Sequence, residues 1–190
     1  MLKKIVAIGP ESTGKSTLCE LLAKHYRTAW VPEYAREYLL KNGSSYTYED
    51  LKVIAKGQLD EEDEYALSLM NNADFAPNSS DDLDHKMLFV DTDMYVMKVW
   101  AEFVFNQCPP FVIEEIASRE YHLYLLCGTD LPWVADELRE YPDLETRDKL
   151  YYMYKDLLVN QSVPWVDISG NAEERLVKAI AAVDKFILGK

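Results

Sequence analysis

The chain has 190 residues, of which 20 are Lys or Arg and 33 are Asp or Glu, so its formal charge at pH 7 is −13. A chain of this length buries roughly 70% of its unfolded surface, which allows a core without disulfides or structural metal. We expect one domain over residues 1–190. The negative charge excludes a general nucleic-acid or anionic-membrane surface, since both need a positive field. Any anionic ligand must meet a local cationic pocket.

The cysteines and the amino-terminal segment indicate a reducing, cytoplasmic setting. Cys19, Cys108 and Cys127 lie far apart and lack the spacing of a zinc site or a disulfide framework. The first apolar run is too short for a signal peptide, and no apolar stretch approaches the ~20 residues of a membrane helix. We expect neither nucleic-acid nor membrane partners, and a homo-oligomer is left open.

Short apolar runs alternate with amphipathic helical patterns, which predicts a parallel sheet covered by helices. This is a three-layer α/β/α fold. We expect strands at 5–8, 29–31, 87–90, 122–126 and 163–168. We expect helices around 18–25, 34–40, 47–70, 94–106, 148–158 and 176–187.

Three segments between or within these elements have a distinct composition. Thr47 followed by Asp50 indicates a capping box at the start of the helix at 47–70. The acidic run at 60–64 is interpreted as a solvated face rather than a metal site. Residues 71–85 are expected to form a loop, and residues 128–147 a polar lid.

Residues 9–16 match G-x-x-x-x-G-K-[ST] without a gap, directly between a predicted strand and a predicted helix. The glycines let backbone N–H groups approach phosphate oxygens, and the helix N-terminus adds partial positive charge. We expect Lys15 to reach the β- and γ-phosphates of ATP and the Ser16 hydroxyl to bind Mg²⁺. Thr17 either touches the α-phosphate or only starts the helix. The predicted nucleotide-binding residues here are Gly9, Glu11, Ser12, Thr13, Gly14, Lys15, Ser16 and Thr17.

Carboxylates are expected beside this loop, at the ends of two strands. Asp91 follows four apolar residues, as a Walker B acid does, and either completes a Mg²⁺ shell or caps the next helix. Asp93 is either a substrate ligand or the cap itself. Glu33 lies just beyond the second strand, where it either faces an acceptor hydroxyl as general base or pairs with Arg36 on a surface helix.

The lid segment carries the remaining candidates. Arg139 and Arg147 either place charge on the transferring phosphoryl group or pair with neighbouring glutamates. Trp133 either stacks on a planar ligand or anchors the packing. The candidate catalytic residues are Lys15, Glu33, Asp91, Arg139 and Arg147, and the candidate substrate-binding residues are Glu33, Tyr34, Arg36, Asp93 and Trp133.

The motifs at 9–17, 32–37, 91–93, 132–134 and 169–176 resemble the ribosylnicotinamide kinase domain of the NadR-type bifunctional proteins, over nearly the whole chain. The resemblance implies a P-loop kinase with five parallel strands in the order 2-3-1-4-5. It places Asp91 near Mg²⁺, Glu33 near the acceptor, lid arginines over the phosphates, and Gly170 and Asn171 near adenine. The closing motif carries Asn171-Ala172 where the family pattern has Asp-Tyr.

The resemblance implies transfer of the ATP γ-phosphate to the 5′-hydroxyl of nicotinamide riboside, which yields nicotinamide mononucleotide in NAD salvage. The chain starts at the P-loop strand, so adenylyl transfer and DNA repression are not expected. Two alternatives stay open: a kinase for another small acceptor, and a nucleotide-dependent ATPase switch acting on a protein partner. A switch hydrolyses ATP without an acceptor, whereas a kinase consumes ATP in proportion to one.

Overall fold

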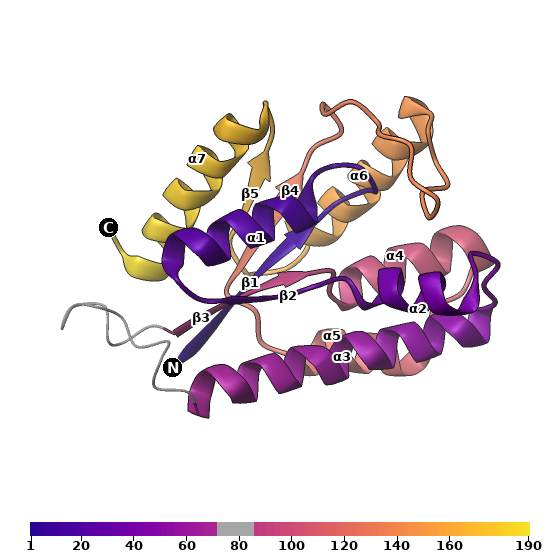
Figure 1. Ribbon diagram of the computed structural model, residues 1–190, viewed down its shortest axis with the longest axis horizontal. Coiled ribbons are helices and arrows are strands. Elements are labelled where there is room, and N and C mark those ends of the chain that lie inside the picture. Colours follow the sequence, from indigo (N-terminus) through magenta and orange to yellow (C-terminus); the bar gives the residue numbers. More distant parts are fainter. Residues whose placement is uncertain (72–85) are drawn as a thin grey trace.

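A parallel β-sheet forms the centre of the computed structural model, in which residues 1–71 and 86–190 are described (Figure 1). Its five strands lie in the order β2-β3-β1-β4-β5, and every pairing between neighbours is parallel. This confirms the order that the resemblance implies. The strands are Leu2–Ile8 (β1), Ala29–Val31 (β2), Lys86–Asp91 (β3), Leu123–Cys127 (β4) and Trp165–Ile168 (β5).

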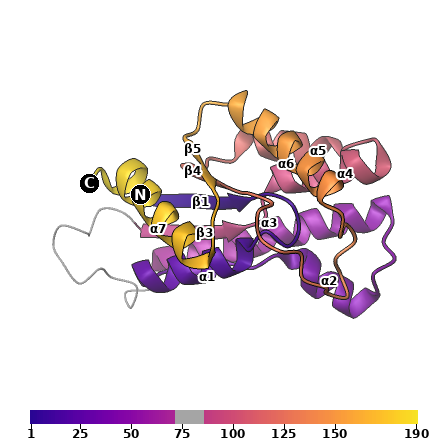
Figure 2. The ribbon, with the colours of Figure 1, turned by 90° about the horizontal axis from the view of Figure 1, so that it is seen from above.

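Helices connect the strands and cover both faces of the sheet, which confirms the three-layer arrangement (Figure 2). The helices are Lys15–Tyr26 (α1), Tyr34–Asn42 (α2), Tyr48–Asn71 (α3), Met94–Phe105 (α4), Pro110–Ser118 (α5), Leu144–Val159 (α6) and Ala172–Val183 (α7), and α7 continues into a π-helical turn at Asp184–Leu188.

Alternation along the central strand divides the core into two layers. Ile5 and Ala7 of β1 face α1 and α7, while Val6 and Ile8 face α3, α4 and α6. All four side chains are at most 1% exposed. Successive side chains of a strand point to opposite faces, so a central parallel strand that is apolar at every position must be covered on both sides.

Helix α5 was not anticipated from the sequence. Pro109 and Pro110 end the preceding pattern, but Pro110 stands at the first position of α5. The first N–H groups of a helix have no acceptor within the helix, so the absence of an N–H in proline costs no hydrogen bond there. The fixed φ of proline also matches the helical value. A pair of prolines therefore opened a helix instead of extending a loop.

Helix α6 begins at Leu144, four residues before the expected start at 148. Asp143 caps it by accepting the N–H of Thr146 at 2.7 Å, so the irregular lid segment ends at residue 143. The expected loop at 71–85 lies outside the described residues, apart from Asn71, which ends α3.

The interpretation of the acidic run at 60–64 as a solvated face is wrong for Glu62. Its side chain is 1% exposed, and its carboxylate accepts from Lys4 at 2.6 Å, Arg119 at 3.2 Å and the Tyr121 hydroxyl at 2.8 Å. A buried carboxylate persists only when paired and hydrogen bonded, and these cations supply both conditions.

The capping box at the start of α3 is confirmed. Thr47 donates its N–H to the Asp50 carboxylate at 2.8 Å, and its hydroxyl oxygen accepts the N–H of Asp50 at 3.3 Å.

Among the described residues, none of the helices has the length and apolar character that crossing a membrane requires.

Candidate functional site: a phosphate-binding loop beside two carboxylates

The loop after β1 has the backbone shape that its glycines permit. Gly9 has a φ of +143°, and a Cβ there would lie 2.6 Å from the carbonyl oxygen of Cys127. Gly14, with a φ of 79°, occupies the left-handed region directly before α1. Both positions exclude an ordinary side chain, the first by contact and the second by conformation. The loop therefore curls tightly between β1 and α1.

Lys15 is the first residue of α1, and its ammonium group turns back over the loop. Its Nζ donates to the carbonyl oxygen of Pro10 at 2.9 Å. The first turn of α1 holds no acidic residue, and its N-cap makes no side-chain hydrogen bond. The helix N-terminus thus keeps its partial positive charge and its free N–H groups for an anion.

Asp91 ends β3 directly beside this loop, because β1 and β3 pair in a register that sets Ala7 opposite Asp91. Its side chain is fully buried, and neither carboxylate oxygen has a hydrogen-bond partner in the described part of the chain. Burial, followed by the charge of Glu33, raises the pKa of Asp91 to about 6, although Lys15 and the hydroxyl of Ser16 act in the opposite direction. A buried carboxylate without a partner is suited to a cation or a proton.

Glu33 reaches the same place from the turn between β2 and α2. Val31 pairs with Val90 across the two strands, so Glu33 emerges close to Asp91. The alternative surface ion pair between Glu33 and Arg36 is not formed, because Arg36 makes a two-pronged contact with the Asp136 carboxylate, at 3.2 and 2.8 Å. Glu33 is left facing the pocket.

Gln58 of α3 binds the backbone on both sides of Glu33 and the backbone carbonyl of Asp91, so it helps to fix the positions of both carboxylates. The sequence did not single out this residue. Its side-chain oxygen accepts the N–H of Tyr34 at 2.8 Å, and its amide donates to the carbonyls of Pro32 at 3.1 Å and Asp91 at 3.5 Å. The residues on both sides of Glu33 are therefore tied to the end of β3. A polar residue at an apolar position of a helix was the only sequence signal.

The lid segment lies against the phosphate loop and is held there by Glu11. This carboxylate accepts the backbone N–H groups of Glu140 at 3.0 Å and Tyr141 at 2.6 Å, and the indole N–H of Trp133 at 3.3 Å. The hydroxyl oxygen of Ser12 accepts the N–H of Val134 at 3.1 Å. Glu11 and Ser12, expected to bind nucleotide, thus also dock the lid.

These elements enclose a cavity of about 480 Å³ whose wall carries both charged and apolar side chains. The charged part includes the phosphate loop, both carboxylates, Arg36 and Arg139. The aromatic and aliphatic part comes from β2, α2, the α2–α3 loop, α4, α6 and the lid: Trp30, Leu39, Tyr46, Val96, Trp100, Phe103, Leu138, Tyr141, Leu150 and Tyr154.

The structure brings most of the expected site residues to this cavity. On its wall are Gly9, Glu11, Ser12, Thr13, Gly14, Lys15, Ser16, Thr17, Glu33, Arg36, Asp91 and Arg139. Six other expected residues are not on it: Tyr34, Asp93, Trp133, Arg147, Gly170 and Asn171.

Those outside the wall have structural contacts of their own. Asp93 caps α4 by accepting the N–H groups of Tyr95 at 3.0 Å and Val96 at 3.3 Å, and burial raises its pKa to about 7. Tyr34 packs against Gly57, where a Cβ would come within 2.2 Å of its ring. Asn171 forms a capping box with Glu174 at the start of α7. Capping was the open alternative for Asp93, and the structure supports it.

Arg147 does not belong to the lid, contrary to expectation. It lies in the first turn of α6, is 3% exposed, and donates to backbone carbonyls of the phosphate loop and of the segment after β4. Its guanidinium group therefore sits behind the loop instead of over the cavity. The early start of α6 is the physical reason for the difference.

Comparison with known proteins assigns most of the chain to one family. The model of a family described as AAA domain matches residues 4–175. The chain belongs to the AAA domain family. This match includes the phosphate loop, both carboxylates and the lid of the present AAA domain.

Two curated relatives of this AAA domain are the trifunctional NAD biosynthesis/regulator proteins NadR of Salmonella typhimurium and Escherichia coli. They are 25% and 26% identical to it, each over 98% of this chain. The chain spans 43% of the length of each relative. The resemblance drawn from the motifs is thereby confirmed.

Two solved structures share the fold. A NadR protein in complex with NR superposes with a TM-score of 0.74 at 23% identity, over 99% of this chain and 50% of that one. A NadR protein in complex with NAD and AMP-PNP superposes with a TM-score of 0.69 at 22% identity, with the same coverage. The overall fold of the chain is therefore a known one.

Proposed function

We propose that this protein is an ATP-dependent kinase that phosphorylates the 5′-hydroxyl of nicotinamide riboside. The observation that carries the proposal is that Lys15, Glu33 and Asp91 line one cavity beside a phosphate-binding loop. Such a loop binds the phosphates of a nucleotide, and nearby carboxylates complete the requirements for phosphoryl transfer. The acceptor is taken from the relatives named for NAD biosynthesis and from the NadR complex with NR.

The chain's own residues fit a magnesium ion. Asp91 presents two buried oxygens without hydrogen-bond partners in the described part of the chain, and the exposed Ser16 lies on the same cavity wall. One carboxylate and one hydroxyl, completed by phosphate oxygens and water, are ligands that Mg²⁺ accepts. When bound, the ion neutralises charge on the phosphates. We assign Ser16 and Asp91 to hold it.

The two carboxylates differ in exposure, and this divides their roles. Asp91 is fully buried, whereas Glu33 is partly exposed on the cavity wall. A general base must reach the hydroxyl proton of a bound acceptor. We therefore assign Glu33 to orient the acceptor and take its proton, and Lys15 to hold the phosphates.

The lid contributes a cationic side chain, Arg139, to the cavity wall. It lines the cavity, and its guanidinium group donates to the carbonyl oxygen of Val134 at 2.5 Å. Arg36 also lines the cavity. A guanidinium group held in a water-poor site stabilises charge that develops during transfer. We assign this role to Arg139, since Arg147 lies elsewhere.

The aromatic side chains on the cavity wall suit a flat acceptor ring. The Trp100 indole donates to the Tyr46 hydroxyl at 2.8 Å, and their ring centroids lie 4.9 Å apart. Such a pair is rigid, and its faces bind planar or cationic rings. We propose that this wall receives the nicotinamide, with Gly170 and Asn171 near adenine.

The three free cysteines are consistent with a reducing cytoplasm.

The deciding experiment measures ATP consumption with Mg²⁺ across a panel of nucleosides and identifies the products by mass. We expect nicotinamide riboside to give its monophosphate, and Lys15→Ala and Glu33→Gln to lower turnover by at least about 100-fold. Phosphorylation of another nucleoside alone would reject the acceptor and keep the kinase. ATP hydrolysis that needs no acceptor would instead support a nucleotide switch.

A further inference from the structure

Two buried arginines contact the outer side of the phosphate loop at successive residues. Arg147 of α6 donates to the carbonyl oxygen of Ser12 at 3.4 Å, and Arg175 of α7 donates to that of Thr13 at 3.0 Å. Each arginine is 3% exposed, and neither lines the cavity. Both guanidinium groups are therefore behind the loop, on the side away from the phosphate site.

A peptide unit is planar and trans, so its carbonyl and its N–H point in opposite directions. Holding the carbonyls of Ser12 and Thr13 outward thus aims the N–H groups of Thr13 and Gly14 away from the arginines. Ser12 has a φ of 57°, a region that a serine rarely occupies and that its surroundings must stabilise. The contact from Arg147 on its carbonyl supplies part of that support.

Both arginines also tie the phosphate loop to the segment after β4. Arg147 donates to the carbonyls of Thr129 at 3.4 Å and Leu131 at 3.3 Å, where the lid segment begins. Its three acceptors are all backbone carbonyls, so this guanidinium group joins the phosphate loop to the root of the lid.

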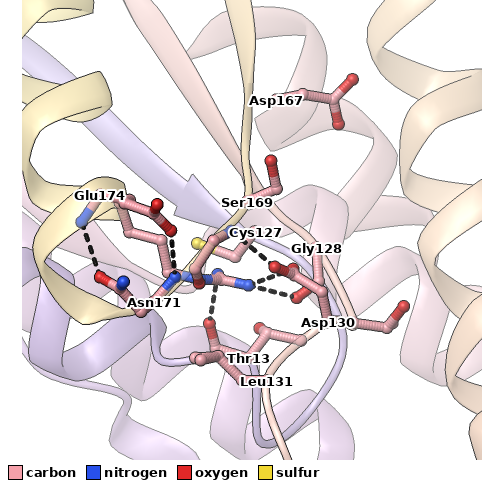
Figure 3. A network of polar contacts seen from close by, with 12 residues as sticks. Thr13, Cys127, Gly128, Asp130, Leu131, Asp167, Ser169, Asn171 and Glu174 are labelled. Atoms are coloured by element: carbon pink, nitrogen blue, oxygen red, sulfur yellow. Dashed lines mark hydrogen bonds and ion pairs between the residues drawn. The ribbon is translucent and has the colours of Figure 1, made fainter.

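Arg175 contacts this segment too, and it adds a contact with the loop before α7. It donates to the carbonyls of Gly170 at 2.7 Å and Gly128 at 3.0 Å, and it pairs with the Asp130 carboxylate. Figure 3 shows Thr13 of the phosphate loop near Gly128 and Asp130, which both belong to the segment after β4. The loop before α7 is thereby tied to the phosphate loop.

The two arginines differ in whether a carboxylate balances their positive charge. Arg175 is balanced by Asp130, but no carboxylate of the described residues lies within ion-pair distance of Arg147, and its Nε is buried without a partner. A buried charge without a counter-ion is unfavourable until an anion comes near. In a chain of net charge −13, this cation favours phosphate at the adjoining loop.

We propose that Arg147 and Arg175 are positioning residues that preset the phosphate loop for a nucleotide, acting through the peptide units that follow Ser12 and Thr13. This inference rests on nucleotide binding in the proposed function and is independent of the acceptor. The arginines do not touch the phosphates. They hold the donors of Thr13 and Gly14 in place before binding, which reduces the entropy lost on binding.

The test is direct binding of a non-hydrolysable ATP analogue with Mg²⁺, without acceptor, to Arg147→Met and Arg175→Met. We expect about tenfold weaker binding for each, as for a lost hydrogen bond to a charged group. With ATP and the acceptor, KM for ATP should rise while KM for the acceptor stays within about twofold. Hydrogen exchange of peptides covering residues 9–16 should become faster in the nucleotide-free variants.

The matched control is Arg119→Met. Arg119 is also a guanidinium group of low exposure, held by Glu62, Asp63 and Glu115, and it does not line the cavity. Its loss should lower Tm and leave analogue affinity and exchange at residues 9–16 unchanged. A purely structural role of Arg147 and Arg175 would give the same result as this control.

Lysine variants keep the inference testable if the methionine variants do not fold. Arg147→Lys and Arg175→Lys retain the charge but not the fork of donors, so we expect affinities between those of wild type and methionine variants. Folded variants that bind the analogue as tightly as wild type, with unchanged exchange at 9–16, would overturn the inference alone. A wild-type protein that does not bind the analogue would overturn the proposed function as well.

Discussion

The carboxylate of Glu11, within the phosphate loop, accepts the backbone N–H of Tyr141 in the lid at 2.6 Å. The same carboxylate accepts the N–H of Glu140 and the indole N–H of Trp133. A single side chain of the loop therefore holds a segment that is about 130 residues away in the chain. The position of the segment that carries Trp133, Glu140 and Tyr141 and the shape of the phosphate loop are linked at this residue.

Replacement of this residue tests the link. Glu11→Ala removes the acceptor of three donors, so we expect the lid to open and KM for ATP to rise about tenfold, because hydrogen bonds to charged groups are strong. Fluorescence of Trp133 should shift towards that of an exposed indole. The control is Glu137→Gln, which changes an exposed lid carboxylate. Unchanged hydrogen exchange over residues 132–141 in Glu11→Ala would show that the lid is held by other contacts.

Asp91→Asn should change how stability depends on pH. Asp91 titrates at about 6 in the folded protein against an ordinary value of 3.8, so the folded state holds the proton more tightly. In wild type, the tighter binding of this proton stabilises the folded state fully below pH 3.8, and this stabilisation is lost as the pH rises through 6. Asparagine does not ionise, so at pH 7 the variant should be more stable by on the order of 2–3 kcal/mol.

Urea unfolding of metal-free protein in a chelator, followed from pH 4 to pH 8, measures this difference. The gain of Asp91→Asn over wild type should be smallest at pH 4 and constant above pH 7. A gain that does not vary with pH would mean that the carboxylate is not disfavoured by burial. Titrating groups that do not interact with Asp91 are common to both proteins and cancel in the comparison, whereas Glu33, whose charge raises the pKa of Asp91, contributes to the difference.

Gln58→Leu should reduce turnover more than it raises KM. The change leaves the N–H of Tyr34 and the carbonyl of Pro32 without their partner, so Glu33 between them loses its fixed position. We expect a loss of stability of about 2–4 kcal/mol and a fall in kcat of at least about tenfold.

The control for this change is Leu69→Ala, in the same helix and also 1% exposed. It should lower stability by about 2–5 kcal/mol through a cavity, with kcat unchanged at temperatures where the protein is folded. Equal effects of both variants on kcat would assign Gln58 a purely structural role.

Gly9→Ala tests the close approach of the phosphate loop to β4. The new methyl group would lie 2.6 Å from the carbonyl oxygen of Cys127, at a φ of +143°. The backbone carbonyl cannot move aside as a flexible side chain does. We therefore expect the free energy of unfolding to fall by on the order of 2–4 kcal/mol and ATP binding to be lost. Gly43 has a φ of +96°, but no atom would lie within 4 Å of an added Cβ. Gly43→Ala should therefore lower the free energy of unfolding by only about 1 kcal/mol. Thermal unfolding and nucleotide titration of both variants separate contact from conformation.

Local patterns of residues were sufficient to predict the strands, the phosphate loop and its two neighbouring acids. Short apolar runs indicate strands, and residues 9–16 are contiguous, so no knowledge of distant contacts is needed. Asp91 and Glu33 were found because parallel strands end at the same edge of a sheet. The order of the strands came from the resemblance alone.

Contacts between distant residues were decided only by the tertiary structure. Arg147 meets Ser12 across 135 positions and Arg175 meets Thr13 across 162, and nothing in either local pattern specifies those partners. Glu62 is buried because the sheet and α5 bring Lys4 and Arg119 to it. Local spacing sets which face of an element a side chain occupies, whereas packing of whole elements sets what that face meets.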